Sequence, residues 1–365
     1  MKVIKCSLLV LLLPMLVMAG NDGEKVDKKI SREFSIQPDG RVELYNRYGS
    51  MDIAIGTANH VKIDIIISVT AGTEKKAQDA LDKISVDFEE GTNRVRATTE
   101  IAESSTGWTN WFNTGKIDMD IHYQVLVPAD VFLDLTNKYG DIYLETTDRD
   151  ISIDLAYGEM KLGDINGKLD LDMAYSEGNM SQIGDGQLNL AYSDLEMEDA
   201  KNIHINMKYT DVEAGTFADL KLVSAYSDLH SVSVGDMEYT GKYDDIEVEQ
   251  IKSINAQTGY SDIKVRELHN QGNFDMRYGD LQIENISRGF SRLDIKTSYT
   301  GVNLEFKPDA SFSIDAETNY CEIQHSGLKV TENVERPTSR TFKASRGNGS
   351  GQIVVRMNYG ELIIE

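Results

Sequence analysis

The sequence predicts an all-β protein whose larger part is a β-solenoid, a single-stranded β-helix with coils of about 17–21 residues. A short phrase recurs at a near-constant period, and apolar residues alternate with polar ones on both sides of it. The phrase is a tyrosine, a small residue and a carboxylate, as in Tyr209-Thr210-Asp211. From Tyr139 to Tyr278 the steps between tyrosines are 18, 18, 17, 17, 17, 17, 17 and 18 residues. Such a period is typical of repeat proteins that stack their units around a continuous core.

The apolar alternation changes phase at each phrase. Leu188, Leu190 and Tyr192 share one side of a strand, and Leu195 and Met197 resume the pattern after the phase change. Two short strands with a break between them predict one coil with a corner at the phrase. The alternative is an antiparallel meander with a hairpin turn at each phrase. It is less favoured, because the first central turn position is mostly Ser or Thr, where tight hairpin turns need Gly, Asn or Asp.

Stacked coils would place the tyrosines of successive phrases one above another as a structural ladder. The predicted ladder comprises Tyr139, Tyr157, Tyr175, Tyr192, Tyr209, Tyr226, Tyr243, Tyr260, Tyr278, Tyr299, Tyr320 and Tyr359, with an outlying copy at Tyr48. The alternation puts the rings on the side of the core residues, which predicts an inner corner. The alternative is an outward ribbon that binds sugar rings or partners.

The carboxylates two residues after the tyrosines form a second row. Like charges at coil spacing repel each other, so each carboxylate is expected to close its own turn by accepting backbone N–H groups. A row of oxygen ligands also suits calcium, for which the candidate residues are Asp194, Asp211, Asp228, Asp245, Asp262 and Asp280. The Gly-Gly-x-Gly-x-Asp repeat of calcium β-rolls is missing, so the favoured interpretation has no metal and no cofactor.

The chain divides into an exported leader, an N-terminal unit and the repeat array. A basic start, an apolar stretch and the small-residue exit Val17-Met18-Ala19 predict a signal peptide, and no later segment is apolar enough to span a membrane. Thr73 is a plausible N-cap, with Ala77, Ala80 and Leu81 on one helical face. The expected organisation is a signal peptide (1–19), a flexible lead-in (20–30), a strand-rich unit (31–128) with a helix (73–84), and the array (129–365) with a loop insertion (325–351).

Charge and cysteine content restrict the partners. The formal net charge is −23, and loss of Lys2 and Lys5 with the signal peptide makes it −23 − 2 = −25. Nucleic acid and anionic lipid are therefore excluded as favoured partners, whereas a protein or glycan partner in the cell envelope is expected. Cys321 alone would remain after Cys6 is removed, so the exported chain has no internal disulfide.

Trp108, Trp111 and Phe112 lie together in a polar stretch between two expected strands. The two tryptophans of the chain lie within four residues of each other, which makes this stretch a candidate contact site for a partner. The alternative is a cap over the open end of the array. No catalytic residues are expected, because the acids are spread evenly along the coils and the histidines show no metal-ligand spacing.

Several features resemble the toast-rack family, DUF4097, of bacterial adhesin-like proteins. They are the exported acidic chain, phrases such as Tyr139-Gly140-Asp141-Ile142-Tyr143-Leu144, and the step Val125-Leu126-Val127-Pro128 before the array. The resemblance implies a β-solenoid with an adhesive or scaffolding role in the periplasm or at the cell surface, and it brings no catalytic residues. The alternatives are an envelope-stress or surveillance component that binds a membrane protein, and a polysaccharide-active β-helix enzyme.

Overall fold

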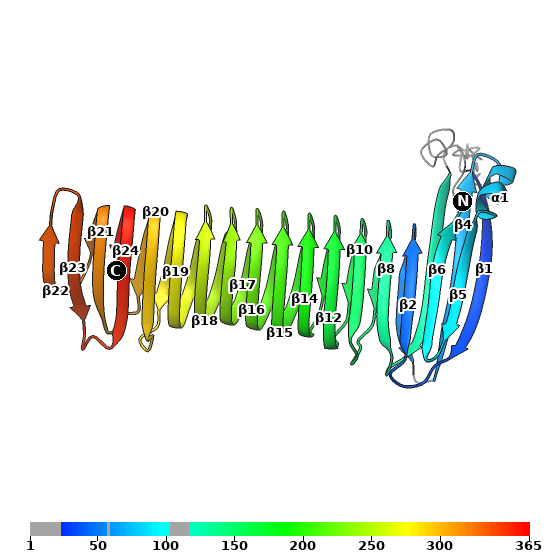
Figure 1. Cartoon of the computed structure of the whole chain (residues 1–365), viewed down its shortest axis with the longest axis horizontal. Helices are drawn as coiled ribbons and strands as arrows, with labels where there is room; N and C mark the ends of the chain where they lie inside the picture. The colour runs from blue at the N-terminus through cyan, green and yellow to red at the C-terminus, as the bar shows by residue number, and fades with distance from the viewer. Residues whose placement is uncertain (1–22, 57–58, 103–116) are drawn as a thin grey trace, which may run out of the picture.

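The computed structural model describes residues 23–56, 59–102 and 117–365 of the chain. The expected signal peptide, and the candidate contact residues Trp108, Trp111 and Phe112, lie outside these described residues. Within the described ranges the molecule is an elongated rod of strands that lie side by side along its long axis (Figure 1). No helix in these ranges is long and apolar enough to cross a membrane.

The strands of the array run parallel to those of the next coil and belong to one sheet, which has 24 strands in the described part of the chain. The early coils contain two short strands each, and the later coils are traced by one long bent strand. The parallel pairing confirms the solenoid and excludes the hairpin meander. These strands are β8 (Phe132–Lys138), β9 (Ile142–Leu144), β10 (Ile151–Ala156), β11 (Glu159–Leu162), β12 (Ile165–Ala174), β13 (Glu177–Met180), β14 (Ile183–Ala191), β15 (Asp194–Lys208), β16 (Asp211–Ala225), β17 (Asp228–Lys242), β18 (Asp245–Gly259), β19 (Asp262–Ile286) and β20 (Arg292–Phe306).

Residues at equal positions of successive coils stack, because the register between coils equals the repeat. Asp211 pairs with Asp228, and Leu222 pairs with Tyr239. One interior row, no member of which is more than 3% exposed, consists of Leu188, Ile205, Leu222, Tyr239, Ala256, Phe274 and Ile295. The small Ala256 between the large Tyr239 and Phe274 keeps the row filled without overpacking.

The first coil of the rod lies upstream of the expected array boundary. Strand β2 (Arg41–Arg47) pairs in parallel with β8, and β3 (Met51–Gly56) pairs in parallel with β9. The sheet is therefore continuous across residue 128, where the sequence suggested a separate unit. The remaining N-terminal strands extend the two walls of the rod: β1 (Glu24–Ser35), β4 (His60–Ala71), β5 (Ile84–Gly91), β6 (Arg94–Ile101) and β7 (Asp118–Pro128).

The expected flexible lead-in is a strand from Glu24 onward. Glu24 pairs with Ala71 in the antiparallel ladder of β1 and β4. Val26, Ile30 and Phe34 pack against the core from β1. Lys and Arg stand between these apolar residues in the sequence and dilute the alternation, which is why the segment was read as a polar lead-in.

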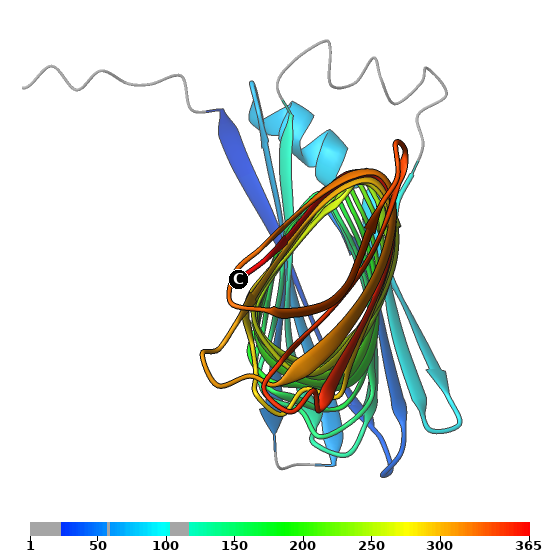
Figure 2. The same ribbon diagram turned by 90° about the vertical axis from the view of Figure 1, so that its left-hand side faces the viewer.

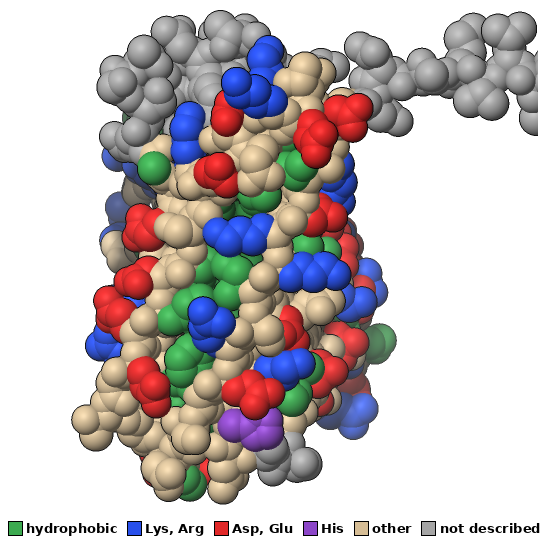
Figure 3. Space-filling view, turned by 90° about the vertical axis from the view of Figure 1, so that its right-hand side faces the viewer, with side chains coloured by type: hydrophobic (Ala, Val, Ile, Leu, Met, Phe, Trp, Pro, Cys, Tyr) green, Lys and Arg blue, Asp and Glu red, His purple; other side chains and the backbone are tan. Residues whose placement is uncertain are grey.

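The helix α1 (Glu74–Leu81) packs against β4 and β1. The hydroxyl of its N-cap, Thr73, accepts a hydrogen bond from the Lys76 backbone N–H at 3.3 Å. The helix ends three residues before the expected position, and Ile84 instead begins β5. At this end of the rod apolar side chains are interleaved with charged ones (Figure 3), and Phe34 packs on Phe88 with ring centroids 5.8 Å apart.

The expected loop insertion at 325–351 is largely a β-hairpin. It is formed by β22 (Lys329–Glu335) and β23 (Ser339–Arg346), and β23 pairs antiparallel with β21 (Phe312–His325). This arrangement covers one edge of β21 at the C-terminal end of the rod (Figures 1 and 2). The stretch looked like a projecting loop because its small and basic residues mask a short alternation that buries Phe342 and Ala344.

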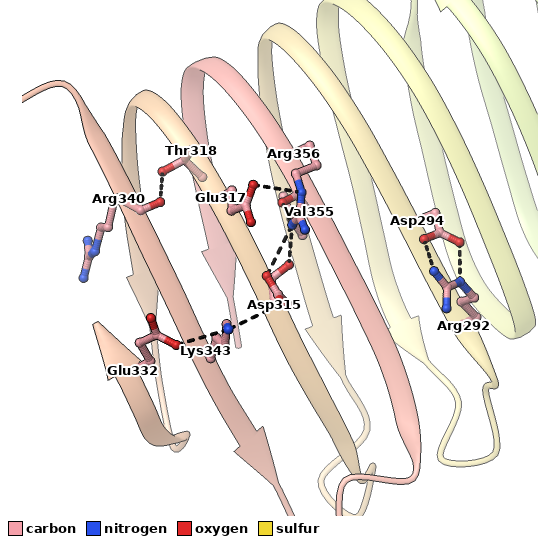
Figure 4. A network of polar contacts seen from close by, with 10 residues as sticks. All are labelled: Arg292, Asp294, Asp315, Glu317, Thr318, Glu332, Arg340, Lys343, Val355 and Arg356. Atoms are coloured by element: carbon pink, nitrogen blue, oxygen red, sulfur yellow. Dashed lines mark hydrogen bonds and ion pairs between the residues drawn. The ribbon is translucent and has the colours of Figure 1, made fainter. Parts of the chain in front are cut away.

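The last strand, β24 (Gly351–Ile364), is inserted between β20 and β21 and pairs in parallel with both. Charged side chains tie it to β21, and a further ion pair joins β23 to β22 (Figure 4). Arg356 contacts Asp315 and Glu317, each at 3.3 Å, and Lys343 contacts Glu332 at 3.1 Å. These side chains are about half exposed, so the pairs contribute little stability individually, and the backbone ladder does most of the joining.

Candidate functional site

The recurring tyrosines form one continuous stack of thirteen rings along a corner of the rod. Neighbouring ring centroids lie 4.5–5.2 Å apart, with interplanar angles of 1–17°. The stack includes Tyr48 and the twelve tyrosines of the predicted ladder, with Tyr359 placed between Tyr299 and Tyr320. We call this feature the tyrosine ribbon.

The tyrosine ribbon lies on the outside of the corner, so the expectation of an inner corner was wrong. Tyr209 is 42% exposed and Tyr320 is 58% exposed. The reason is the backbone: every ribbon tyrosine has a φ between 51° and 62°, the left-handed conformation. A residue in that conformation interrupts the extended strand and reverses the direction of its side chain. The tyrosine therefore points outward, although the alternation in the sequence assigns it to the inward side. The strain at each tyrosine, about 1 kcal/mol, is opposed by ring stacking, on both faces within the ribbon and on one face at its ends, Tyr48 and Tyr320.

Where the residue after the tyrosine is Ser or Thr, its side chain points inward, and several of these side chains join neighbouring coils. Thr210 is 1% exposed, and its hydroxyl donates to the Lys208 carbonyl at 3.1 Å and accepts from the Ser193 backbone N–H at 3.4 Å. Ser193 and Ser227 make the same pair of contacts in their own coils. This hydroxyl ladder satisfies backbone groups that the turn would otherwise leave unpaired. The preference for Ser and Thr at this position of the repeat is the signal of the hydroxyl ladder in the sequence.

In the first two coils, where the small residues are Gly49 and Gly140, an asparagine replaces the hydroxyl. Asn137, two residues before Tyr139, donates to the carbonyls of Gly49 and Asp141, each at 2.9 Å. A Cβ on Gly140 would lie 2.0 Å from the Gly49 carbonyl oxygen, so this junction needs glycine. The first two coils are thus joined by a side-chain amide in place of the hydroxyl ladder.

The carboxylates form a row beside the tyrosine ribbon, and several reach the next coil instead of their own turn. Asp262 accepts from the Asp280 backbone N–H at 2.8 Å, and Asp141 accepts from the Glu159 N–H at 2.9 Å. Partial burial raises the pKa of the Asp211 carboxyl, and repulsion from Asp228 and Asp194 adds to this effect. The pKa of the Asp245 carboxyl is raised in the same way, by burial and then by repulsion from Asp228 and Asp262.

The candidate calcium residues lie in this one row. Asp194, Asp211, Asp228, Asp245, Asp262 and Asp280 follow each other coil by coil. Among the described residues, no group of three or more acidic, histidine or cysteine side chains is arranged to hold a metal ion. A single line of carboxylates supplies too few converging oxygens for the six to eight ligands that calcium takes.

Cations lie on the other flank of part of the tyrosine ribbon. The ammonium nitrogens of Lys138 and Lys208 lie 5.3 Å from the ring centroids of Tyr139 and Tyr209, and the Arg277 guanidinium lies 5.4 Å from that of Tyr278. Cation–π attraction of this kind contributes about 0.5–1 kcal/mol at exposed positions. The ribbon therefore presents phenol groups between a row of carboxylates and a sparser set of cations.

Asp244 is an exception to the hydroxyl ladder. It occupies the inward position after Tyr243 and is 5% exposed. Its carboxylate accepts from the Tyr239 hydroxyl and the Ser224 hydroxyl, each at 2.8 Å, and from the Ser227 backbone N–H at 3.1 Å. Tyr239 stands in the core row where other coils have an apolar residue, so its buried hydroxyl needs a partner that a carboxylate can supply. Burial raises the pKa of the Asp244 carboxyl in spite of these hydrogen bonds.

These features define a β-solenoid whose outer corner carries a stacked aromatic ribbon and whose last strand is inserted one coil back. The chain belongs to the Toastrack DUF4097 family, whose model matches residues 48–365.

Solved structures of similar chains come from bacteria. A "putative cell adhesion protein" from Clostridium sporogenes is 9% identical, with 92% of this chain and 99% of that chain covered and a TM-score of 0.18. A "putative lipid binding protein" from Parabacteroides distasonis is 11% identical, with 75% and 96% covered and a TM-score of 0.26. A "putative adhesin" from Parabacteroides merdae is 8% identical, with 75% and 95% covered and a TM-score of 0.29. A search of curated proteins finds no match.

Proposed function

We propose that the protein is an exported, non-enzymatic rod that acts as an adhesin-like or scaffold module in the bacterial cell envelope. The observation that carries the proposal is the tyrosine ribbon, an ordered row of half-exposed phenols along one corner. Membership of the family also supports this proposal, since the resemblance to toast-rack proteins implies an adhesive or scaffolding role.

The geometry of the tyrosine ribbon determines what it offers a partner. The ring faces are covered by neighbouring rings, so sugar rings cannot stack on them along most of the ribbon. The ring edges and hydroxyls remain accessible, next to the carboxylate row. Because the backbone and the stacking already hold the rings in place, a partner that spans several coils makes repeated contacts with little ordering cost. Such a surface suits an extended protein partner better than a small molecule.

The experiment compares binding of the purified mature chain to isolated bacterial envelope fractions, measured by co-sedimentation. In the test variant Tyr192, Tyr209 and Tyr226 are changed to Phe, which keeps the ring stack and removes three hydroxyls. In the control variant the exposed residues ten positions farther on, Asn202, Asp219 and Asp236, are changed to Ala; they form a row of their own. We expect the ribbon variant to lose most of its binding and the control to keep it. Absence of binding by the unmodified chain, or equal binding by all three, would contradict the proposal.

A further inference from the structure

A furrow of about 690 Å³ lies on the outside of the rod near its N-terminal end. It crosses six strands that lie side by side, in the order β4, β7, β3, β9, β11 and β13. Two rows of outward side chains line it. The first row contains Asp64, Gln124, Asp52, Tyr143, Lys161 and Asn179, and the second contains Lys62, Leu126, Ala54, Glu145, Gly163 and Ser181.

Tyr143 in this furrow differs from every tyrosine of the ribbon. It lies within β9, its φ is not positive, and its side chain is 38% exposed. In the part of the chain that the structure describes, no other aromatic ring stacks on it, so its faces are not covered in the way that the ribbon's are. Its hydroxyl donates to Asp141 at 3.4 Å, which orients the ring without covering it. Leu126 and Ala54 add apolar surface beside it.

The polar groups of the furrow include both donors and acceptors, and their charges nearly balance. Lys62 pairs with Asp64 at 2.7 Å, and Glu145 accepts from the Ile55 backbone N–H at 3.1 Å. Lys161 has no carboxylate within ion-pair distance among the described residues, so its ammonium group is free to donate to a ligand. The carboxylates of Asp52, Asp64 and Glu145 face two lysines, so neither a strongly anionic nor a strongly cationic ligand is favoured.

We propose that this furrow binds a neutral oligosaccharide of pyranose units, with one sugar ring stacked on Tyr143. A partly exposed aromatic face that no other ring covers receives the apolar C–H side of a pyranose, and the flanking amides, carboxylates and Lys161 pair with its hydroxyls, each of which both donates and accepts. The furrow runs along the rod axis over six strands, about 4.8 Å apart, which makes room for several sugar units in line. This inference is independent of the tyrosine ribbon, because the two surfaces share no side chain.

The test uses the mature full-length chain in affinity electrophoresis through gels that contain one polysaccharide each. The neutral probes are xylan, glucomannan and hydroxyethyl cellulose, and the anionic probes are alginate and polygalacturonate. We expect retardation by at least one neutral polysaccharide and none by the anionic ones. Tyr143→Ala should weaken that binding at least about tenfold, and Tyr143→Phe, which keeps the stacking face, should stay within about threefold.

Two further variants make the test specific to the furrow. Ala54→Arg fills its apolar side and should also abolish retardation, whereas Tyr226→Phe in the tyrosine ribbon should leave it unchanged. Far-UV circular dichroism and melting temperatures of all variants show whether they are folded. The proposal is overturned if the folded unmodified chain is retarded by no neutral polysaccharide, if anionic polysaccharides alone retard it, or if Tyr143→Ala and Ala54→Arg bind as well as the unmodified chain.

Discussion

Tyr299 stacks on Tyr359, with ring centroids 4.8 Å apart and planes within 2°, although sixty residues separate them in the sequence. Tyr320, the next phrase along the chain, stacks on the far side of Tyr359 at 4.9 Å. The C-terminal strand therefore enters the rod one coil back, between two coils that follow each other in sequence. The last strand thereby has a hydrogen-bonded neighbour on each side, and the Phe306 backbone N–H donates to the Glu365 backbone oxygen at 3.0 Å.

Removal of residues 351–365 should detach the terminal coil from the rod. Without β24, β20 and β21 each lose a complete parallel ladder and expose unpaired backbone groups. We expect the truncated chain to form higher oligomers in size-exclusion chromatography and to lose amide protection in β21 to β23 in hydrogen exchange. The control is the full-length chain at the same concentration. A truncated chain that stays monomeric with unchanged protection would show that β24 is dispensable.

The repeat itself was predictable, because the period and the apolar alternation follow directly from coils that stack in register. The order of coils at the C-terminal end was not predictable. Tyr359 carries the same phrase as Tyr320, and the period indicates which residues stack without indicating which coil is the neighbour. The hairpin at β22 and β23 was missed for a related reason, since its strands are short and mostly polar.

The direction of the tyrosine side chains could not be predicted from the alternation of apolar and polar residues either. Counting by twos assumes an extended backbone, whereas Tyr157 and its equivalents take a left-handed conformation that inverts the count. Non-glycine residues with positive φ are rare, so Tyr would not be chosen for that position on propensity alone. The furrow around Tyr143 was not predictable from the sequence, because it depends on β3, β7 and β9 lying side by side, and the repeat pattern does not reach β7.

Substitutions at Tyr209 should separate stacking from backbone strain. Tyr209→Ala removes two ring contacts, at 4.8 and 5.0 Å, and keeps a Cβ in the left-handed conformation. Tyr209→Gly removes the same contacts and relieves the strain, while the unfolded chain gains freedom. We expect both variants to be destabilised, with Gly more stable than Ala by about 0.5–1 kcal/mol. Urea unfolding followed by circular dichroism measures the difference. Ala more stable than Gly would show that positive φ carries no strain here.

The hydroxyl ladder can be tested at Thr210. Thr210→Val keeps the shape of the side chain but removes the donor to the Lys208 carbonyl and the acceptor for the Ser193 N–H. Because this position is buried, the variant should lose about 1–3 kcal/mol of unfolding free energy. Thr210→Ser is the matched control and should be nearly neutral, since Ser fills the equivalent position in neighbouring coils. Equal stability of the Val and Ser variants would rule out a structural role for the hydroxyl.

Salt should stabilise the rod by screening the carboxylate row, and calcium should have no specific effect. The pKa values of Asp211 and Asp245 are raised in part by repulsion along the row, which ions in solution reduce. We expect sodium chloride and calcium chloride at equal ionic strength to raise the melting temperature by the same amount. An additional increase in millimolar calcium, lost in a variant with Asp211→Asn and Asp228→Asn, would instead establish a calcium site.

Asp244 should make the stability of the central coils depend on pH. Burial raises its pKa in the folded protein above the ordinary value of 3.8, so the folded state holds this proton more tightly than the unfolded state does. The contribution of Asp244 to the free energy of unfolding is therefore fully present below about pH 4. It is lost as the pH rises through the pKa of this carboxyl in the folded protein. Asp244→Asn keeps an acceptor for the Ser227 N–H, and its amide can donate to the Ser224 and Tyr239 hydroxyls, without an ionisable proton.

The melting temperature of Asp244→Asn relative to the unmodified chain should therefore rise between pH 4 and pH 8, with the variant the more stable of the two at pH 8. The surrounding carboxylates titrate in both proteins, so their contribution largely cancels in the difference, and Tyr239 stays neutral throughout because burial raises its pKa. The matched control is Asp262→Asn, an exposed member of the carboxylate row. If the difference for Asp244→Asn does not depend on pH, the carboxyl has the same pKa in the folded and unfolded chains. The hydrogen bond from the Tyr239 hydroxyl would then fully compensate the effect of burial on that pKa.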